Sequence, residues 1–190
     1  MLPIIKRYVL AFSLLLTACS PGSEPTQQAP AAAVEAPVAA RPEPVDTVRG
    51  FGRHHFGDDL RSFPPLALVH QSRPDLATYQ APAEDGQLRF GLVALTKVLY
   101  TFYQNKLYGI SLYAAGPEGL RQLTAEATSR YGSPSQVLEG LAAWGGGQQV
   151  QADMGHSQLN EGQEYYLKLM SLPLYHQLEA SIAAEQASGR

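Results

Sequence analysis

A proline- and alanine-rich stretch near the amino terminus limits how much of this chain can fold. From Ser20 to about Val48 the residues are mainly Pro, Ala, Glu and Gln, with no aromatic residue and only four valines as larger apolar side chains. Such a segment cannot bury enough apolar surface to offset the conformational entropy lost on folding. We therefore expect residues 19–49 to form a disordered tether and residues 50–190 to form a single globular domain.

The segment before this tether has the order of a secretory signal peptide. Lys6 and Arg7 precede a short apolar run from Tyr8 to Leu16, and small residues follow. A membrane-spanning helix needs about 20 consecutive apolar residues, roughly twice the length of this run. The sequence therefore predicts that residues 1–18 are a signal peptide removed during export.

The residues Leu16-Thr17-Ala18-Cys19 resemble the lipobox of bacterial lipoproteins, in which a leucine and two small residues precede a cysteine. The resemblance covers Met1 to Ser20 and implies that Cys19 becomes the mature amino terminus, with lipid on its sulfur and an acyl chain such as palmitate on its amine. Several chains anchor durably, because each buried methylene contributes about 0.8 kcal/mol. By resemblance to enterobacterial lipoproteins, Ser20 implies the outer membrane, facing the periplasm. The alternative is a plain signal peptide with a chance cysteine.

Cysteine count and charge exclude two further classes. Cys19 is the only cysteine, so the chain forms no internal disulfide even in an oxidising compartment. Removal of the signal peptide takes away Lys6 and Arg7 and changes the net charge from −3 to −5. An acidic chain of this kind lacks the basic surface that nucleic-acid phosphates require, so we expect no nucleic-acid partner.

Two β-rich runs around a short polar break predict a hairpin over residues 97–113. Asn tolerates the positive φ of tight hairpin turns, so Asn105-Lys106 is the predicted two-residue loop. Tyr100, Phe102 and Tyr113 would then share one aromatic face, and the opposite face would be aliphatic. A loop of another length would change this partition.

Helical spacing predicts two helices. Gly116-Pro117 opens the first and Gly132 ends it, with one apolar stripe between them. Pro173 opens a second helix that fades near Gly189.

Further strands are predicted over residues 150–154 and 165–170, with an earlier strand within 88–95. The order of elements predicts an α+β domain in which an antiparallel sheet carries helices on one face. The run YTFYQNKLYGISL, followed by a helix ending in YGSP, resembles small uncharacterised bacterial envelope domains. That resemblance implies neither an activity nor a role for any residue.

One tight polar cluster contains His54, His55, Asp58 and Asp59. Zn²⁺ takes about four N, O or S ligands, so these side chains are candidates for a metal site. Adjacent histidines usually point apart, however, and no second pair at ligand spacing follows. The alternative is a loop in which Asp58 or Asp59 caps a short helix through Leu60. We therefore expect no metal and no cofactor.

Other catalytic patterns are weak. The serines show neither G-x-S-x-G nor S-x-x-K spacing. The pairs Glu84-Asp85 and Glu161/Glu164 lie in polar stretches, where a solvated carboxylate is poorly suited to acid–base catalysis. The remaining candidate is an aromatic group, which is either a binding surface or ordinary sheet packing. Its members are Tyr100, Phe102, Tyr113 and Trp144.

Two functional hypotheses follow. The first is a non-enzymatic, lipid-anchored module on the periplasmic side of the envelope, which binds another envelope protein or a cell-wall component, or assists assembly. Its membrane partner is lipid, through acylated Cys19. The alternative is a periplasmic metal-assisted or acid–base hydrolase that uses His54, His55, Asp58 and Asp59.

The lipid anchor can be tested directly. Cys19→Ser should leave an uncleaved or soluble precursor that takes up no labelled fatty acid, because the thiol that receives the lipid is absent. Metabolic labelling and membrane fractionation of the variant measure this. Unchanged labelling and fractionation would rule out lipidation at Cys19.

Overall fold

The structure, a computed structural model, describes residues 44–82, 88–158 and 163–189. The signal peptide, Cys19, most of the tether and the candidate carboxylates Glu84, Asp85 and Glu161 therefore lie outside the described residues. The predictions made for these residues stay predictions.

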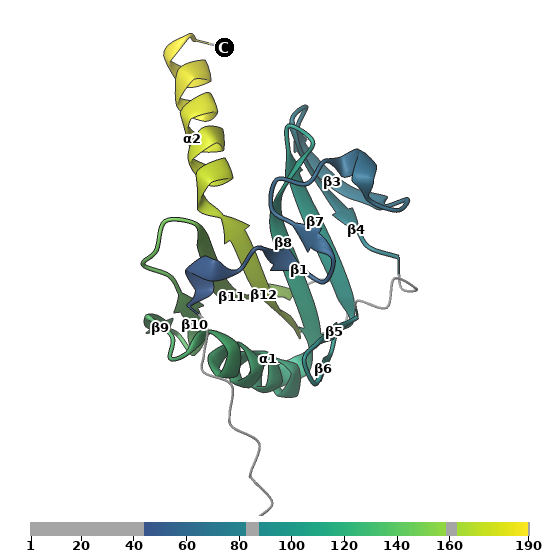
Figure 1. The fold of residues 1–190 in the computed structure, drawn as a ribbon, viewed down its shortest axis with the longest axis vertical. Helices are drawn as coiled ribbons and strands as arrows, with labels where there is room; N and C mark the ends of the chain where they lie inside the picture. Colours follow the sequence, from purple (N-terminus) through teal and green to yellow (C-terminus); the bar gives the residue numbers. More distant parts are fainter. Residues whose placement is uncertain (1–43, 83–87, 159–162, 190) are drawn as a thin grey trace, which may run out of the picture. The chain divides into compact units, whose positions relative to one another are not determined.

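Within the described residues, eight strands form one antiparallel sheet in the spatial order β3-β4-β7-β8-β12-β11-β10-β9 (Figure 1). Their bounds are Ala67–Arg73 (β3), Leu76–Gln80 (β4), Lys97–Tyr103 (β7), Lys106–Ala115 (β8), Gln136–Leu138 (β9), Leu141–Trp144 (β10), Val150–Gln158 (β11) and Gln163–Ser171 (β12). The helices are α1 (Gly116–Tyr131) and α2 (Leu172–Ala187). The predicted α+β class, with helices packed against an antiparallel sheet, is confirmed.

Short elements cover part of the sheet. Their bounds are Val45–Thr47 (3-10 helix η1), Gly50–Phe51 (β1), His54–His55 (β2), Leu60–Ser62 (3-10 helix η2), Arg89–Phe90 (β5) and Val93–Ala94 (β6). β1 pairs with β2 and β5 pairs with β6, each as a two-stranded sheet. Val45 is buried in the main core, so folded structure begins before residue 50, where composition placed the end of the tether.

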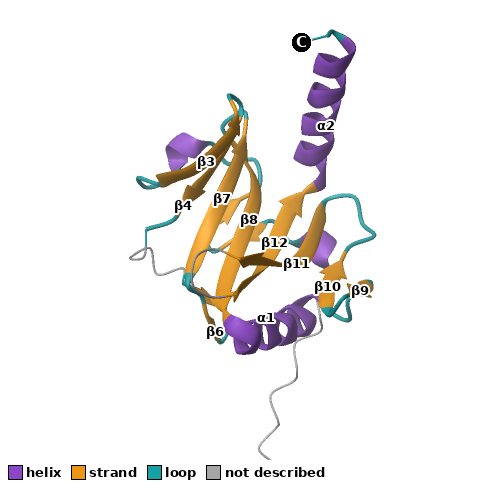
Figure 2. Ribbon diagram, turned by 180° about the vertical axis from the view of Figure 1, so that it is seen from behind, coloured by secondary structure: helices purple, strands orange, loops and turns teal. Residues whose placement is uncertain are grey.

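The main core lies on one face of the central strands. Along β7, Val98, Tyr100 and Phe102 are buried, and the residues between them are partly exposed. This alternation follows from the two-residue period of a strand. From α1, Leu123 and Ala127 enter the same core, and Figure 2 shows α1 lying beside one end of the sheet.

The second helix packs on a smaller cluster. Leu178 of α2 lies with Tyr103, Tyr108 and Met170. Tyr103 and Met170 alternate with main-core residues on their strands, so this cluster belongs to the other face. The two helices therefore pack on opposite faces of the sheet, and not on one face as the order of elements predicted. Figure 1 shows α2 continuing from β12 and extending past the sheet.

Both predicted helices are present with their expected ends. Pro117 and Pro173 lie in the first turns of α1 and α2, where a missing N–H costs nothing. α1 ends at Gly132, whose φ is 84°, in the region that favours glycine. The carbonyl of Gly132 accepts a hydrogen bond of 2.8 Å from the indole Nε1 of Trp144, which joins the helix end to β10.

The predicted turn of the central hairpin is wrong by one residue. The loop is Gln104-Asn105, with φ values of 49° and 63°, so Tyr103 pairs with Lys106. The pairing then shifts by one residue at Tyr108, which places Lys97 opposite Tyr113. Such a slip moves side chains to the other face of a strand. Tyr100 and Tyr113 therefore lie on opposite faces, not on one aromatic face.

The segment 88–95, where one strand was predicted, contains two short strands. They are β5 and β6, which form a hairpin that turns at Gly91 with a φ of 59°. The alternating strands over 150–154 and 165–170 are confirmed as parts of β11 and β12.

Three of the four aromatic residues considered for a binding surface are core residues. Tyr100, Phe102 and Trp144 are 0%, 2% and 2% exposed. Tyr113 is half-buried on the other face, 5.1 Å from Tyr166 between ring centroids. The packing interpretation of this group is therefore correct for the three buried members.

Stability should separate Tyr100 from Tyr113. Tyr100→Ala leaves a cavity in the main core and should cost about 3 to 5 kcal/mol. Tyr113→Ala should cost on the order of 1 kcal/mol, because that ring is half-exposed and contributes mainly its contacts with Tyr166 and the Lys97 ammonium. Urea unfolding of both variants measures the difference, and equal losses would contradict this assignment of faces.

Candidate functional site

The four residues of the predicted polar cluster do not point to one place. His54 is 4% exposed, and its ring stacks on Phe63 with the centroids 3.9 Å apart. His55, the next residue of β2, is exposed. Successive strand residues face opposite sides, so the two imidazoles cannot bind one ion together.

The two aspartates stabilise local turns. The Asp58 carboxylate accepts a hydrogen bond of 2.7 Å from the backbone N–H of His55. Asp59 is the N-cap of η2 and accepts a hydrogen bond of 3.0 Å from the backbone N–H of Arg61. The capping interpretation is confirmed for Asp59. Among the residues that the structure describes, no group of three His, Cys, Asp or Glu side chains could hold a metal ion.

Glu164 is the one described member of the Glu161/Glu164 pair. Its carboxylate accepts hydrogen bonds from the Lys97 ammonium and, at 3.3 Å, from the Thr96 hydroxyl. The same ammonium lies 4.4 Å from the centroid of the Tyr113 ring. Glu164 of β12 is therefore paired with Lys97 of β7, whose ammonium also lies over the Tyr113 ring of β8. These contacts connect side chains of three neighbouring strands.

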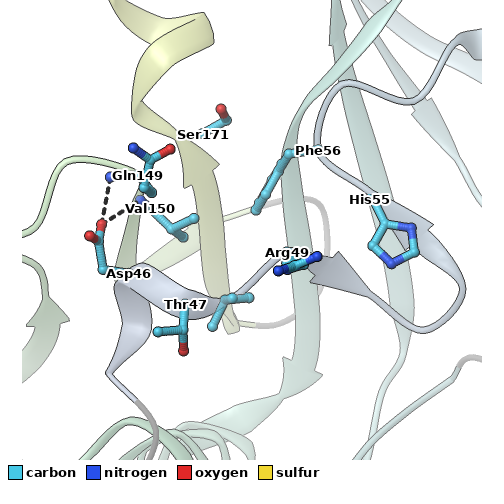
Figure 3. A pocket seen from close by; sticks show the side chains of 9 residues that line it. Asp46, Thr47, Arg49, His55, Phe56, Gln149, Val150 and Ser171 are labelled. Carbon is cyan, nitrogen blue, oxygen red and sulfur yellow. Dashed lines mark hydrogen bonds between the residues drawn. The ribbon is translucent and has the colours of Figure 1, made fainter.

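A pocket of about 570 Å³ lies where the first described residues meet the sheet. Its walls come from η1 and the residues after it, the end of β2, and the ends of β11 and β12 that lie side by side (Figure 3). The lining residues are Asp46, Thr47, Val48, Arg49, His55, Phe56, Gln149, Val150 and Ser171.

Asp46 joins the amino-terminal segment to the sheet. One carboxylate oxygen accepts hydrogen bonds from the backbone N–H groups of Gln149, at 2.5 Å, and Val150, at 3.0 Å. The hydrogen bond from Gln149, followed by that from Val150, lowers the pKa of Asp46 below its usual value. Figure 3 shows both bonds at one side of the pocket. Two N–H dipoles thus stabilise the negative charge of this wall.

Arg49 is the residue of this pocket whose positive charge has no ion-pair partner among the described residues. Its backbone carbonyl accepts a hydrogen bond of 2.7 Å from the N–H of Phe56, which fixes the chain beside the β1–β2 hairpin. Its side chain is exposed and lies between Asp46 and His55 in Figure 3. Within residues 44–82, 88–158 and 163–189, the guanidinium has neither an ion-pair nor a hydrogen-bond partner.

The rest of the lining supplies apolar and neutral polar groups. Val48 and Phe56 are half-buried, and Val150 is buried in the main core. Gln149 and Ser171 lie at the strand ends, where the N–H of Leu172 donates to the Gln149 carbonyl at 2.9 Å. The pocket therefore combines one guanidinium, one imidazole, an apolar wall and neutral hydrogen-bonding groups.

Sequence reasoning missed this site. Asp46 and Arg49 lie in the stretch whose composition predicts a tether, and Gln149 and Ser171 are distant from them in the chain. Valine at positions 45 and 48, with Asp46 between them, was the only local signal that this segment folds. Of the predicted candidates within the described residues, His55 alone lines the pocket.

Comparison with models of protein families found no match, and comparisons with curated proteins and with solved structures found none either. In the described part of the chain, neither helix has the length and hydropathy needed to cross a membrane.

The hydrogen bonds that the Asp46 carboxylate accepts from Gln149 and Val150 should make the free energy of unfolding depend on pH. The folded-state pKa is depressed, so the contribution is complete above the unfolded pKa, near 4, and is lost as the pH falls through the lower folded value. Asp46→Asn should therefore unfold at lower urea than the unsubstituted protein at pH 7. The difference in urea midpoint should shrink below about pH 3. A difference that is the same at pH 7 and pH 2 would contradict a role for the charge.

Proposed function

We propose that this protein is a lipid-anchored lipoprotein of the bacterial envelope, acting as a non-enzymatic module that binds another envelope component in the Arg49 pocket. Acylated Cys19 holds it on a membrane, with the outer membrane facing the periplasm as the expected site. The bound component is an envelope protein or a cell-wall component, and neither a nucleic acid nor a cofactor takes part.

The observation that carries this proposal is the guanidinium of Arg49, which lines a pocket and has no ion-pair or hydrogen-bond partner among the described residues. A surface arginine without a partner is ordinary, but this one shares a concave site with the Phe56 ring and the Gln149 amide. Such pockets bind ligands because the apolar wall contributes affinity and the few polar groups contribute orientation.

The position of the pocket also supports the proposal. Residues 46–49 form one wall, and the hydrogen bonds that Asp46 accepts connect this wall to the start of β11. A polyproline-rich tether of about 30 residues reaches on the order of 90 Å when extended. A ligand well away from the bilayer would therefore be within reach of the domain.

The alternative, a periplasmic hydrolase that uses the four His and Asp residues, gains no support from their placement. His54 is stacked in the core, His55 faces the other way, and Asp59 caps η2. A general base must reach the group from which it takes a proton, and these side chains share no cavity.

Photocrosslinking in the native envelope tests the proposal. A photoreactive amino acid replaces Thr47, an exposed residue of the pocket rim, in the full chain. The matched control places it at Ser129, an exposed residue of α1 that does not line the pocket. We expect a discrete crosslinked envelope component from Thr47 and none from Ser129.

Two results would overturn the pocket as the binding site. One is the absence of any crosslinked component from Thr47 at normal expression. The other is the same component, in equal yield, from both positions.

A further inference from the structure

We infer that the ligand of the Arg49 pocket is a peptide carboxylate: a single anionic group held by the Arg49 guanidinium, next to an apolar side chain that packs on Phe56 and Val48. This inference rests on the proposed function and names the chemistry of the bound component.

The charges around the pocket favour binding of an anion beside Arg49, because the carboxylates there already accept hydrogen bonds from the backbone. The Asp46 carboxylate is stabilised by the N–H groups of Gln149 and Val150, and the Asp58 carboxylate accepts from the N–H of His55. No described residue stabilises the guanidinium of Arg49 in this way. An acidic group on the ligand would supply the missing partner, in the paired geometry that a guanidinium and a carboxylate adopt.

The balance of charge favours a single negative charge over two. One guanidinium faces the pocket, with the His55 imidazole beside it, and Asp46 forms the opposite side. His55 Nδ1 lies 3.9 Å from the Asp58 carboxylate, which competes for any positive charge on that ring. A phosphate dianion would face the nearby carboxylates with too little compensation, whereas a carboxylate needs only Arg49.

The remaining lining suits the rest of a peptide. Phe56 and Val48 are half-buried and offer apolar surface for a side chain, with the buried Val150 behind them. The Gln149 amide and the Ser171 hydroxyl can both donate and accept hydrogen bonds, as the amide group of a peptide requires. The whole chain carries a net charge of −3, which repels anions at long range. Recognition of a carboxylate therefore depends on Arg49 and not on the general field of the protein.

Small peptide-like probes measure how much the carboxylate contributes to binding, apart from the rest of the ligand. The full mature chain, purified in detergent, is titrated with N-acetyl-L-leucine and with N-acetyl-L-leucinamide, which differ only in the anionic group. N-acetyl-D-alanyl-D-alanine represents a cell-wall peptide end, and its affinity relative to N-acetyl-L-leucine separates that source from the carboxyl end of a protein. Binding is followed through NMR signals of Phe56 and Val150.

We expect at least one carboxylate probe to bind at least tenfold more tightly than the leucinamide. Arg49→Gln should remove this preference, and Arg49→Lys should keep part of it, because a lysine retains the charge without the fork of donors. Arg89→Gln, at an exposed arginine of β5 that does not line the pocket, is the matched control and should leave binding unchanged. Urea midpoints check that each variant is folded.

The outcomes distinguish the ligand class from the proposed function. Equal binding of the acid and the amide, no binding of either carboxylate probe, or full binding by folded Arg49→Gln would overturn the carboxylate assignment. In each of these cases a crosslinked component from Thr47 would leave the pocket as a binding site for another ligand. Loss of that crosslink in Arg49→Gln would support both proposals together.

Discussion

Burial of one face of the central strands is the constraint on which the rest of this structure depends. Val98, Tyr100 and Phe102 of β7 alternate with partly exposed residues, and β8 and β12 continue the same buried face. An isolated sheet cannot shield such a face from water, so α1, η1 and the β1–β2 hairpin must cover it. The opposite face buries a smaller cluster beneath α2. Each covering element therefore has its place set by apolar surface that would otherwise be exposed.

The pocket is a consequence of that covering. Val45 is buried in the main core, which draws the amino-terminal segment onto the sheet. The Asp46 carboxylate then satisfies two N–H groups at the start of β11, which would otherwise lack acceptors at that point. With Val45 and Asp46 held in this way, Arg49 lies beside Phe56 and has no partner of opposite charge in the described part of the chain. Because a guanidinium pairs well with a carboxylate, this position is the one to which we assign the anionic group of the proposed ligand.

Local chemistry made several elements predictable. Proline in the first turn and glycine after the last turn delimit helices through backbone rules that need no tertiary contact, and α1 follows them. Alternation along β11 and β12 likewise depends only on which side faces the core. β3 was not predicted, because most of its residues are exposed and leave no alternation to detect. The central hairpin was misassigned because both Gln104 and Asn105 adopt positive φ, and only the pairing of β7 with β8 selects the turn.

The sequence by itself determined the Pro- and Ala-rich composition that predicts a tether, the single cysteine in a segment that resembles a lipobox, the acidic charge and the α+β order of elements. These features can be read from composition and from neighbouring residues. Tertiary structure alone decided that Tyr100 is core while Tyr113 faces the other way, and that of the two histidines His54 is the buried one. It also decided that Arg49 and Gln149 line one pocket. The physical reason is that burial and the meeting of distant strand ends depend on the register of the whole sheet, which no local segment specifies.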